Sequence, residues 1–291
     1  MIRSALVFTI VVAVHNDWNA LEGCLEALGK QRNLSDFEVV IVDDGSDQPA
    51  PNSVLEWNRF FLITIIRQEH AGISRARNKG IQAARGSVVV FVDADSRMQP
   101  DCIEALESKI TQSPRESCFQ LRLIGDRSRL VGRAEELRLT ALQDHLLQPS
   151  GLIRYLNTAG FAILQSRIPS DGNLFNPIAA RGEDTFLLST LMKRGELPVF
   201  VPGAIVQHAV SLSLLGCFRK DIRSAYAERK AYDLIAARGI SIRLTNRERR
   251  SILSSMWRTS GEPTIGRAAW FIVTGRQALR LLVSAFHRLT C

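Results

Sequence analysis

Two carboxylates, Asp93 and Asp95, directly follow an apolar run in the stretch SVVVFVDADSRMQPD, residues 87–101. Side chains alternate along a strand, so residues two positions apart aim to the same side. Two converging carboxylates are costly to desolvate, and a divalent cation relieves that cost. Hard oxygen ligands suit Mg²⁺ or Mn²⁺, whose remaining ligands are often substrate phosphates. The spacing therefore indicates a metal site, although alone it also fits a helix cap before Pro100 or a coincidence of composition.

Polar residues also follow two other apolar runs of the first half. HND (15–17) comes after LVFTIVVAV (6–14), and DDGSD (43–47) comes after FEVVIV (37–42). Helix-patterned segments separate these runs, and near-continuous apolar strands joined by helices are typical of a parallel sheet covered on both faces. The carboxyl ends of such strands share one edge, where ligands bind. We therefore expect the three polar clusters to meet there, although DDGSD alone is also a good turn sequence.

The whole pattern predicts an α/β fold with a mostly parallel twisted sheet and C-terminal helices. Further strands are expected at 60–66, 87–92, 117–125, 158–164 and 197–208, and helices at 72–86, 129–147 and 182–195. Basic helices are expected after residue 216, followed by an amphipathic stretch over 265–290.

The composition is that of an ordinary globular protein, with 291 residues of which 46% are hydrophobic and 23% charged. No apolar run reaches the roughly 18 residues that a membrane-spanning helix needs. The run 6–14 lacks a small-residue cleavage site, so we expect a buried strand there and no secretory signal. Five widely spaced cysteines without a C-x-x-C pair argue against a disulfide framework or a zinc site and favour a cytoplasmic location.

The net charge of +8 is concentrated at one end of the chain. Residues 216–291 hold 15 Lys and Arg against 5 Asp and Glu, whereas the preceding residues hold 22 against 24. Such a basic segment is typical of contact with anionic lipid, nucleic acid or a polyanionic substrate, or of a solvated helical face. No basic sheet interleaved with aromatic residues is visible, so we do not expect a nucleic-acid partner.

Four motifs together resemble the family 2 glycosyltransferases. VVAVHN, FEVVIVDDGS, HAGISRARNKGIQAARGSVVVFVDADS and ARGEDTFL stand in the order and spacing of that family, over residues 5 to 208. Each motif is weak by itself, whereas the four in order are specific. The resemblance implies the GT-A fold, with a Rossmann-like nucleotide-binding half and an acceptor half. It also implies a nucleotide-sugar donor and a Mn²⁺ or Mg²⁺ cofactor.

The resemblance implies a domain division and roles for individual residues. A catalytic domain would span 1–215, with a nucleotide-binding half over 1–99 and an acceptor half over 100–215, before a basic helical extension over 216–291. The residues expected to contact the donor nucleotide are Val14, Asn16, Asp43, Asp44, Arg77, Lys79, Asp93 and Ala94. The expected metal ligand is Asp95, with Asp93 and His208 as further candidates, while Asp184 would be the catalytic base and Glu183 would shape the acceptor site.

These residue types suit the transfer of a sugar from a nucleotide sugar. The nucleoside diphosphate leaves readily only when its charge is neutralised, which a metal at Asp95 and basic groups near Arg77 could do. The acceptor hydroxyl needs a general base opposite the leaving group, and one carboxylate suffices for a single displacement with inversion. The first-turn position of Asp184 in a helix lowers its pKa, so its surroundings must keep it basic enough.

Departures from the family pattern leave the donor and the acceptor open. Ala13 stands where the family has a proline and His15 where it has an aromatic residue. A UDP-sugar is the first expectation, and dTDP or GDP sugars remain open. The acceptor hydroxyl could belong to a glycan, a lipid-linked molecule, a small molecule or a peptide. The alternatives are transfer to a polyprenyl phosphate, which needs no base, and a scaffold that binds nucleotides without catalysis.

Neither a Q-x-x-R-W motif nor a membrane-spanning run is found in the sequence. Both are associated with processive synthases of the family, so we expect a single-addition transferase that is free in the cytoplasm or peripheral at the inner membrane surface. The basic helices after residue 216 could dock on a membrane, form a wall of the acceptor site or make an oligomer interface.

Overall fold

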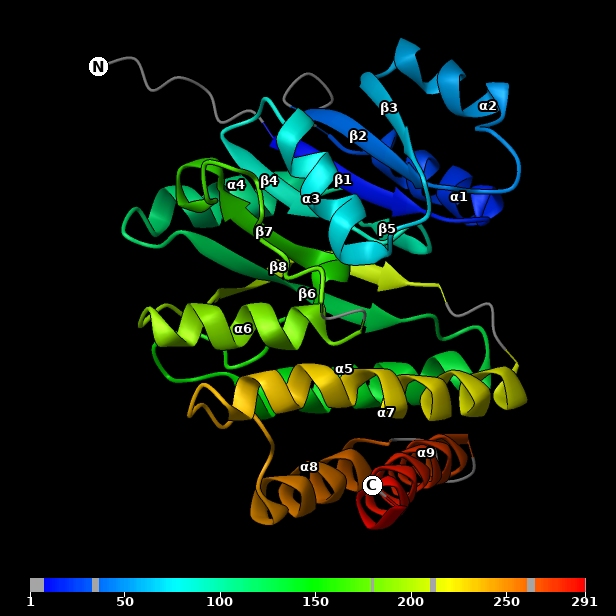
Figure 1. The fold of residues 1–291 in the computed structure, drawn as a ribbon, viewed down its shortest axis with the longest axis vertical. Coiled ribbons are helices and arrows are strands. Elements are labelled where there is room, and N and C mark those ends of the chain that lie inside the picture. Colours follow the sequence, from blue (N-terminus) through cyan, green and yellow to red (C-terminus); the bar gives the residue numbers. More distant parts are fainter. Residues whose placement is uncertain (1–7, 33–36, 179–180, 210–212, 261–264, 291) are drawn as a thin grey trace.

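The computed structural model describes residues 8–32, 37–178, 181–209, 213–260 and 265–290, which fold into layers of helices around a central sheet (Figure 1). The strands are β1 (Phe8–Val14), β2 (Phe37–Asp44), β3 (Leu62–Gln68), β4 (Val88–Phe91), β5 (Ser96–Met98), β6 (Cys118–Gly125), β7 (Phe161–Leu164) and β8 (Val199–His208). The helices are α1 (Trp18–Leu28), α2 (Asn52–Leu55), α3 (Ile73–Ala83), α4 (Cys102–Gln112), α5 (Leu130–Leu146), α6 (Glu183–Lys193), α7 (Leu214–Ala236), α8 (Asn246–Thr259) and α9 (Ile265–Thr290). Short 3₁₀ segments are η2 (Glu56–Arg59), η3 (Thr158–Gly160) and η4 (Gln165–Arg167).

Eight strands of the described chain form one sheet in the order β3-β2-β1-β4-β7-β6-β8-β5. β1 pairs in parallel with β2 and β4, and β2 pairs in parallel with β3. β6 and β8 are also parallel, whereas β7 runs antiparallel between β4 and β6, and β5 runs antiparallel to β8. The predicted α/β fold with a mostly parallel sheet and C-terminal helices is therefore confirmed.

Both faces of the parallel part of the sheet are buried under helices. On one face Ile10 of β1 packs in a core with Leu21 and Leu25 of α1. On the other face Val11 of β1 packs in a second core with Ile81 of α3. Every residue of β2 is buried, which explains its near-continuous apolar run. This two-sided burial fixes the strands and holds the polar residues that follow them at one edge.

The expected strand over 158–164 begins as the 3₁₀ turn η3, so that prediction was too long at its start. Asn157 Oδ1 accepts a hydrogen bond from the backbone N–H of Ala159 at 2.9 Å. Gln120 Nε2 donates to the backbone oxygen of Gly160 at 2.8 Å. These side-chain bonds satisfy the backbone in a turn, and extended pairing starts only with β7.

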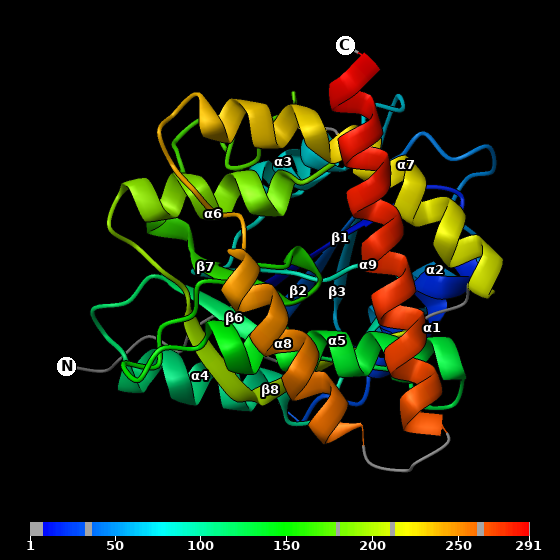
Figure 2. The same ribbon diagram turned by 90° about the horizontal axis from the view of Figure 1, so that it is seen from below.

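The C-terminal helices pack against the rest of the molecule. α8 and α9 lie under α5 and α7, on the side away from the sheet (Figures 1 and 2). Ala134 of α5 shares a small core with Ile252 and Met256 of α8 and Val273 of α9. The predicted boundary between residues 215 and 216 falls inside the first turn of α7.

Four cysteines lie in the described part of the chain, and Cys24, Cys102, Cys118 and Cys217 are all buried free thiols. Cys291, and residues 6 and 7 of the first predicted strand, lie outside the described residues. Within the described residues, no helix combines the length and the apolar character needed to cross a bilayer.

Gln143 of α5 fastens that helix to the sheet and provides a test of the packing. Its Oε1 accepts from the backbone N–H of Leu123 in β6, and its Nε2 donates to the backbone oxygen of the same residue, both at 2.8 Å. Gln143→Leu leaves these buried groups unpaired and should lower the free energy of unfolding by about 2–4 kcal/mol. Urea denaturation measures the loss. The matched control is Gln112→Leu at an exposed site on α4; equal stability of the two variants would contradict this account.

Candidate active site

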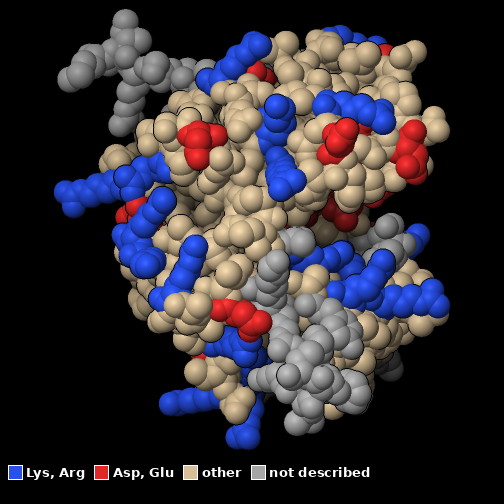
Figure 3. Space-filling model, viewed as in Figure 1, with Lys and Arg blue, Asp and Glu red and all other residues tan. Residues whose placement is uncertain are grey.

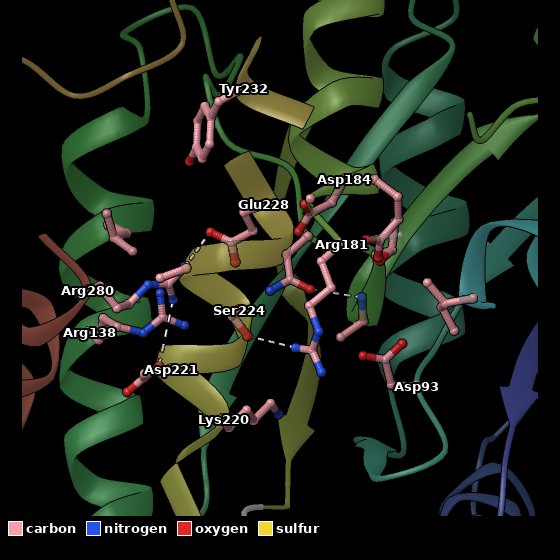
Figure 4. A pocket seen from close by; sticks show the side chains of 18 of the residues that line it. Asp93, Arg138, Arg181, Asp184, Lys220, Asp221, Ser224, Glu228, Tyr232 and Arg280 are labelled. Atoms are coloured by element: carbon pink, nitrogen blue, oxygen red, sulfur yellow. Dashed lines mark hydrogen bonds and ion pairs between the residues drawn. The ribbon is translucent and has the colours of Figure 1, made fainter. Parts of the chain in front are cut away.

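A cavity of about 1670 Å³ lies at the edge of the sheet where β1 and β4 end. Its walls include the starts of α3 and α6 and side chains of α5, α7 and α9 (Figure 4). Figure 3 shows a hollow between the sheet part above and the helices below, with acidic side chains at its back. Of the residues proposed from the sequence, the cavity is lined by Val14, Arg77, Asp93, Ala94, Asp95, Glu183, Asp184 and His208. The described residues that line it do not include Asn16, Asp43, Asp44 or Lys79.

Arg77 of α3 is buried between two carboxylates from distant parts of the chain. One guanidinium nitrogen lies 2.7 Å from Asp93 Oδ1, and another lies 2.7 Å from Glu183 Oε1. The guanidinium also lies over the ring of Phe175, 5.5 Å from its centre. Arg77 therefore joins the D-x-D motif after β4 to the G-E-D motif at α6. Its charge is already balanced, and the carboxylates of Asp93 and Glu183 are engaged with it.

Asp95 and His208 are brought together by the pairing of β5 with β8. Ser96 of β5 lies opposite His208, and the backbone N–H of Ala209 donates to the backbone oxygen of Asp95 at 2.8 Å. Asp95 Oδ2 consequently lies 3.3 Å from His208 Nε2. Burial raises the pKa of Asp95, while His208 acts in the opposite direction. The two side chains form a carboxylate–imidazole pair at the wall of the cavity.

This pair has the donor atoms that a divalent cation takes. Within the described chain, no group of three or more His, Cys, Asp or Glu side chains could hold a metal by itself. Mn²⁺ and Mg²⁺ commonly accept only one or two protein ligands and complete their coordination with substrate phosphates and water. His208 Nδ1 is buried without a hydrogen-bond partner among the described residues, so the ring is held by few competing bonds. Asp95 and His208 therefore fit two ligands of a metal shared with a phosphate-bearing substrate.

Asp43 and Asp44 are buried and bind the backbone beside the cavity. Asp44 Oδ1 accepts from the N–H of Ala71 at 2.8 Å, and its Oδ2 accepts from the N–H of Gly72 at 2.9 Å. Asp43 Oδ1 accepts from the N–H of Ser46 at 2.8 Å. The carboxylate of Asp44 thus fixes the loop that enters α3, and that of Asp43 fixes the turn after β2.

The loops after β1 and β3 place two histidine rings side by side at the cavity. The rings of His15 and His70 have centres 4.2 Å apart, and both residues line the cavity. Their Nδ1 atoms donate to the backbone oxygen of Asp44 at 2.9 and 3.0 Å. His70 was not among the residues proposed from the sequence, although it opens the quoted motif HAGISRARN. The two rings, tilted by 31° to each other, offer an aromatic surface on which a base can stack.

Asn16 and Lys79 differ in their relation to this surface. Asn16 has a left-handed backbone, with φ of 56°, and its Oδ1 accepts from the N–H of Asp47 at 2.7 Å. It therefore connects the loop after β1 to the turn after β2. Lys79 has an exposed side chain on α3 and is not among the described residues that line the cavity.

Asp184 occupies the first turn of α6 and lines the cavity. Burial, and then the neighbouring Glu183, raise the pKa of Asp184 to about 7. The N–H of Thr185, which donates to its Oδ1 at 2.6 Å, and the charge of Arg77 act in the opposite direction. The lowering expected at a helix N-terminus is therefore outweighed by desolvation. Near neutral pH this carboxylate can take up and give back a proton.

Two further cations on the cavity were not proposed from the sequence. Arg181 donates to Ser224 Oγ of α7 at 2.7 Å, and Figure 4 shows both Arg181 and Lys220 on the side of the cavity that faces Asp93. Among the described residues, no carboxylate lies within ion-pair distance of either cation. Arg181 stands directly before the G-E-D motif, where its position could have identified it. Lys220 has no local signal, since its role depends on where α7 packs.

An ionic network joins the C-terminal helices to the same wall. Arg276 of α9 lies 2.5 Å from Asp221 of α7 and 3.7 Å from Glu135 of α5. Arg280 of α9 lies 3.7 Å from Asp221 and also pairs with Glu228 of α7. The network holds α5, α7 and α9 together, so the residues of α7 reach the cavity in a fixed arrangement.

Known proteins with similar sequences and structures are glycosyltransferases. A stretch of 105 residues, 36% of this chain, is 36% identical to glycosyltransferase GlyA of Streptococcus pneumoniae serotype 4, of which it covers 15%. Three curated relatives match over stretches that span 15% to 32% of their own length. Staphylococcus aureus TarS in complex with UDP-GlcNAc has a TM-score of 0.57 at 14% identity, over 98% of this chain and 92% of that one. Mannosyltransferase PcManGT of Pyrobaculum calidifontis, in complex with GDP-Man and Mn²⁺, has a TM-score of 0.58 at 17% identity, over 99% and 81%.

These structural likenesses place the fold among the GT-A glycosyltransferases. The model of the family described as Glycosyl transferase family 2 matches residues 9–166. This stretch contains Asp93 and Asp95 and ends before Asp184 and His208. The match covers more than half of the chain, and the chain therefore belongs to glycosyltransferase family 2.

Proposed function

We propose that the protein is a metal-dependent inverting glycosyltransferase that moves one sugar from a nucleotide sugar to an acceptor hydroxyl. The observation that carries the proposal is that Asp184, with its pKa raised to about 7, lines the same cavity as the Asp95–His208 pair. One group can accept a proton, and the other pair can hold a cation beside a diphosphate. Neighbouring folds bind UDP-GlcNAc, or GDP-Man with Mn²⁺, which supports a nucleotide-sugar donor.

The donor nucleotide would lie across the ends of β1 and β4, near Val14 and Ala94. The adjacent rings of His15 and His70 offer a surface for the base, since base–aromatic stacking tolerates different bases. We assign Asp43, Asp44 and Asn16 the role of holding the loops that carry these rings, because their oxygens are already bonded to backbone N–H groups. A UDP-sugar is the first choice of donor, with dTDP and GDP sugars as the alternatives.

Asp95 and His208 would hold the Mn²⁺ or Mg²⁺ ion, which when bound supplies positive charge beside the leaving diphosphate. Arg77 cannot add to that charge, because its guanidinium is paired with Asp93 and Glu183. Lys220 and Arg181 are the better candidates, since both line the cavity without a carboxylate partner among the described residues. Their ammonium and guanidinium groups would donate hydrogen bonds to the diphosphate oxygens.

Asp184 is the general base in this proposal. Its carboxylate takes the proton of the acceptor hydroxyl while the oxygen attacks the anomeric carbon and the bond to the diphosphate breaks. A base works best when its pKa is close to the working pH, and burial places that of Asp184 there. Glu183 would act through this base, because its negative charge helps to raise the pKa of Asp184 while its own oxygen is bound to Arg77.

Donor binding provides the first test. A thermal-shift panel of UDP-, dTDP- and GDP-sugars, each with Mn²⁺ or with EDTA, should show stabilisation by one donor class in Mn²⁺. A ligand at about 100 times its Kd adds about 2.7 kcal/mol to the stability of the folded state. Asp95→Asn should abolish the dependence on metal, whereas Asp144→Asn, at an exposed site on α5, should not. If none of the nucleotide sugars stabilises the protein, the proposed function is wrong.

Asp184→Asn provides the second test, with two measurements. The release of nucleoside diphosphate should fall by about 10² to 10⁴-fold, and the wild-type rate should rise with pH around 7. The folded state holds a proton on Asp184 that the unfolded chain loses above about pH 4, so wild-type stability falls as pH rises from there to about 7. The variant avoids this fall and should be more stable than wild type at pH 8, by on the order of 4 kcal/mol. Unchanged turnover would instead favour an acceptor that is already ionised, such as a polyprenyl phosphate.

Lys220→Met and Arg181→Met test the cations assigned to the diphosphate. Each should lower the rate of diphosphate release by about 10²-fold, because a charge-stabilising donor is lost in the transition state. Lys193→Met removes an exposed lysine from the last turn of α6 and serves as the matched control. Rates equal to that of the control would show that these cations do not act on the leaving group.

A further inference from the structure

The outward side of α8 and α9 exposes large apolar side chains. Trp257 of α8 is 43% exposed, and Phe271 and Leu282 of α9 are 62% and 68% exposed. On α9 the exposed residues 271, 275, 278 and 282 recur at helical spacing, so they form one stripe along the helix. The opposite side of α9 packs on α5 and α7, so this stripe faces away from the protein. Figure 2 shows α9 in front of the other helices when the molecule is seen from below.

The aromatic residues of this side form a continuous cluster across the two helices. The ring of Trp257 packs edge-on against Trp270, with centres 5.0 Å apart. Trp270 in turn packs against Phe271 at 5.3 Å. Arg267 lies over the ring of Trp257, 5.5 Å from its centre. The cluster is therefore a fixed platform that presents Trp257 and Phe271 to the surroundings.

The charge around this platform is almost entirely positive. Residues 246–290 carry eight Arg, of which Arg276 and Arg280 face the cavity, and two Glu, while α9 itself has no Asp or Glu. Arg250, Arg258 and Arg267 are exposed, whereas Glu248 is bound to Arg154 and Thr245. Figure 3 shows Lys and Arg side chains at the lower edge of the molecule, where α8 and α9 lie.

We propose that this outward face of α8 and α9, made by Arg250, Trp257, Arg258, Arg267, Phe271 and Leu282, docks on the surface of an anionic lipid bilayer. Trp and Phe side chains insert at the boundary between headgroups and acyl chains, while Arg side chains contact anionic headgroups. Each basic residue near an anionic surface and each buried apolar side chain adds to the affinity. The combination on one rigid face matches both parts of such a surface.

A second copy of the chain fits this face less well than a bilayer does. A two-fold dimer places the same patch against itself. The exposed arginines of both copies would then share one interface, and α9 has no Asp or Glu to balance them. The positive charge of this face therefore favours an anionic partner. The apolar stripe favours a partner with an apolar interior, as a bilayer has.

Docking by this face would bring the cavity close to the lipid. Val273, Arg276 and Arg280 of α9 line the cavity, while Phe271 and Leu282 of the same helix face outward. One helix, about 10–12 Å thick with its side chains, then separates the cavity from the bilayer surface. The proposal concerns attachment only and holds whichever sugar donor the cavity binds.

Vesicle flotation of the full chain tests the proposal. Vesicles of phosphatidylcholine with about 30% phosphatidylglycerol should capture the protein at low salt, and affinity should fall at least about tenfold on pure phosphatidylcholine or in about 0.5 M NaCl. Phe271→Ser should weaken binding about tenfold, and Arg258→Gln with Arg267→Gln should weaken it by a similar factor. Circular dichroism and the rate of diphosphate release check that the variants remain folded.

Arg59 and Phe60 provide the matched controls, because they form an exposed arginine–aromatic pair at the end of η2. This segment follows α2, which lies at the end of the molecule away from α8 and α9 (Figure 1). Phe60→Ser and Arg59→Gln should bind vesicles as wild type does. Absence of vesicle binding, or equal weakening by both sets of variants, would overturn the proposal. So would a dimer, seen by analytical ultracentrifugation, that Phe271→Ser dissociates.

Discussion

The buried guanidinium of Arg77 is the interaction on which the arrangement of the site depends. A charge removed from water is stable only when it is paired and hydrogen-bonded. Arg77 meets this condition through Asp93 after β4 and Glu183 at the start of α6, which are far apart in the sequence. The pairing draws these two segments to the same side of α3. Asp95 and Asp184, the neighbours of those two carboxylates in the chain, are consequently delivered to one cavity.

The same pairing separates groups that hold the structure from groups that are available for chemistry. Asp93, Glu183 and Arg77 satisfy one another, and Asp43 and Asp44 are bonded to backbone N–H groups. Burial raises the pKa of the Asp184 carboxylate, and the imidazole of His208 lies beside the carboxylate of Asp95. The motif residues are thus either structural or available for chemistry, and only their bonding partners distinguish the two kinds.

The sequence was sufficient to predict most of the elements, though not β5 or the turn at η3, and the edge at which the polar clusters meet, because these depend on local patterns. Continuous apolar runs require burial on both faces, and β2 is buried along its whole length. Bonding partners could not be predicted, because they depend on contacts across the fold. Nothing in DDGS says that Asp44 turns toward Ala71 and Gly72, and the turn at η3 depends on Gln120 of another strand. Lys220 could not be placed before the packing of α7 was known.

In the basic C-terminal quarter, the net charge alone does not tell which surface is basic, because the arginine side chains face different sides of the helices. Arg276 and Arg280 add two positive charges to the count, yet both face inward and are balanced by Asp221, Glu135 and Glu228. They hold α9 against α7 and complete the wall of the cavity. The arginines beside Trp257 and Phe271 face outward instead. The same residue type therefore has two tasks: the inner arginines of α9 build the site, and the outer arginines of α8 and α9 leave a surface that an anionic partner can neutralise.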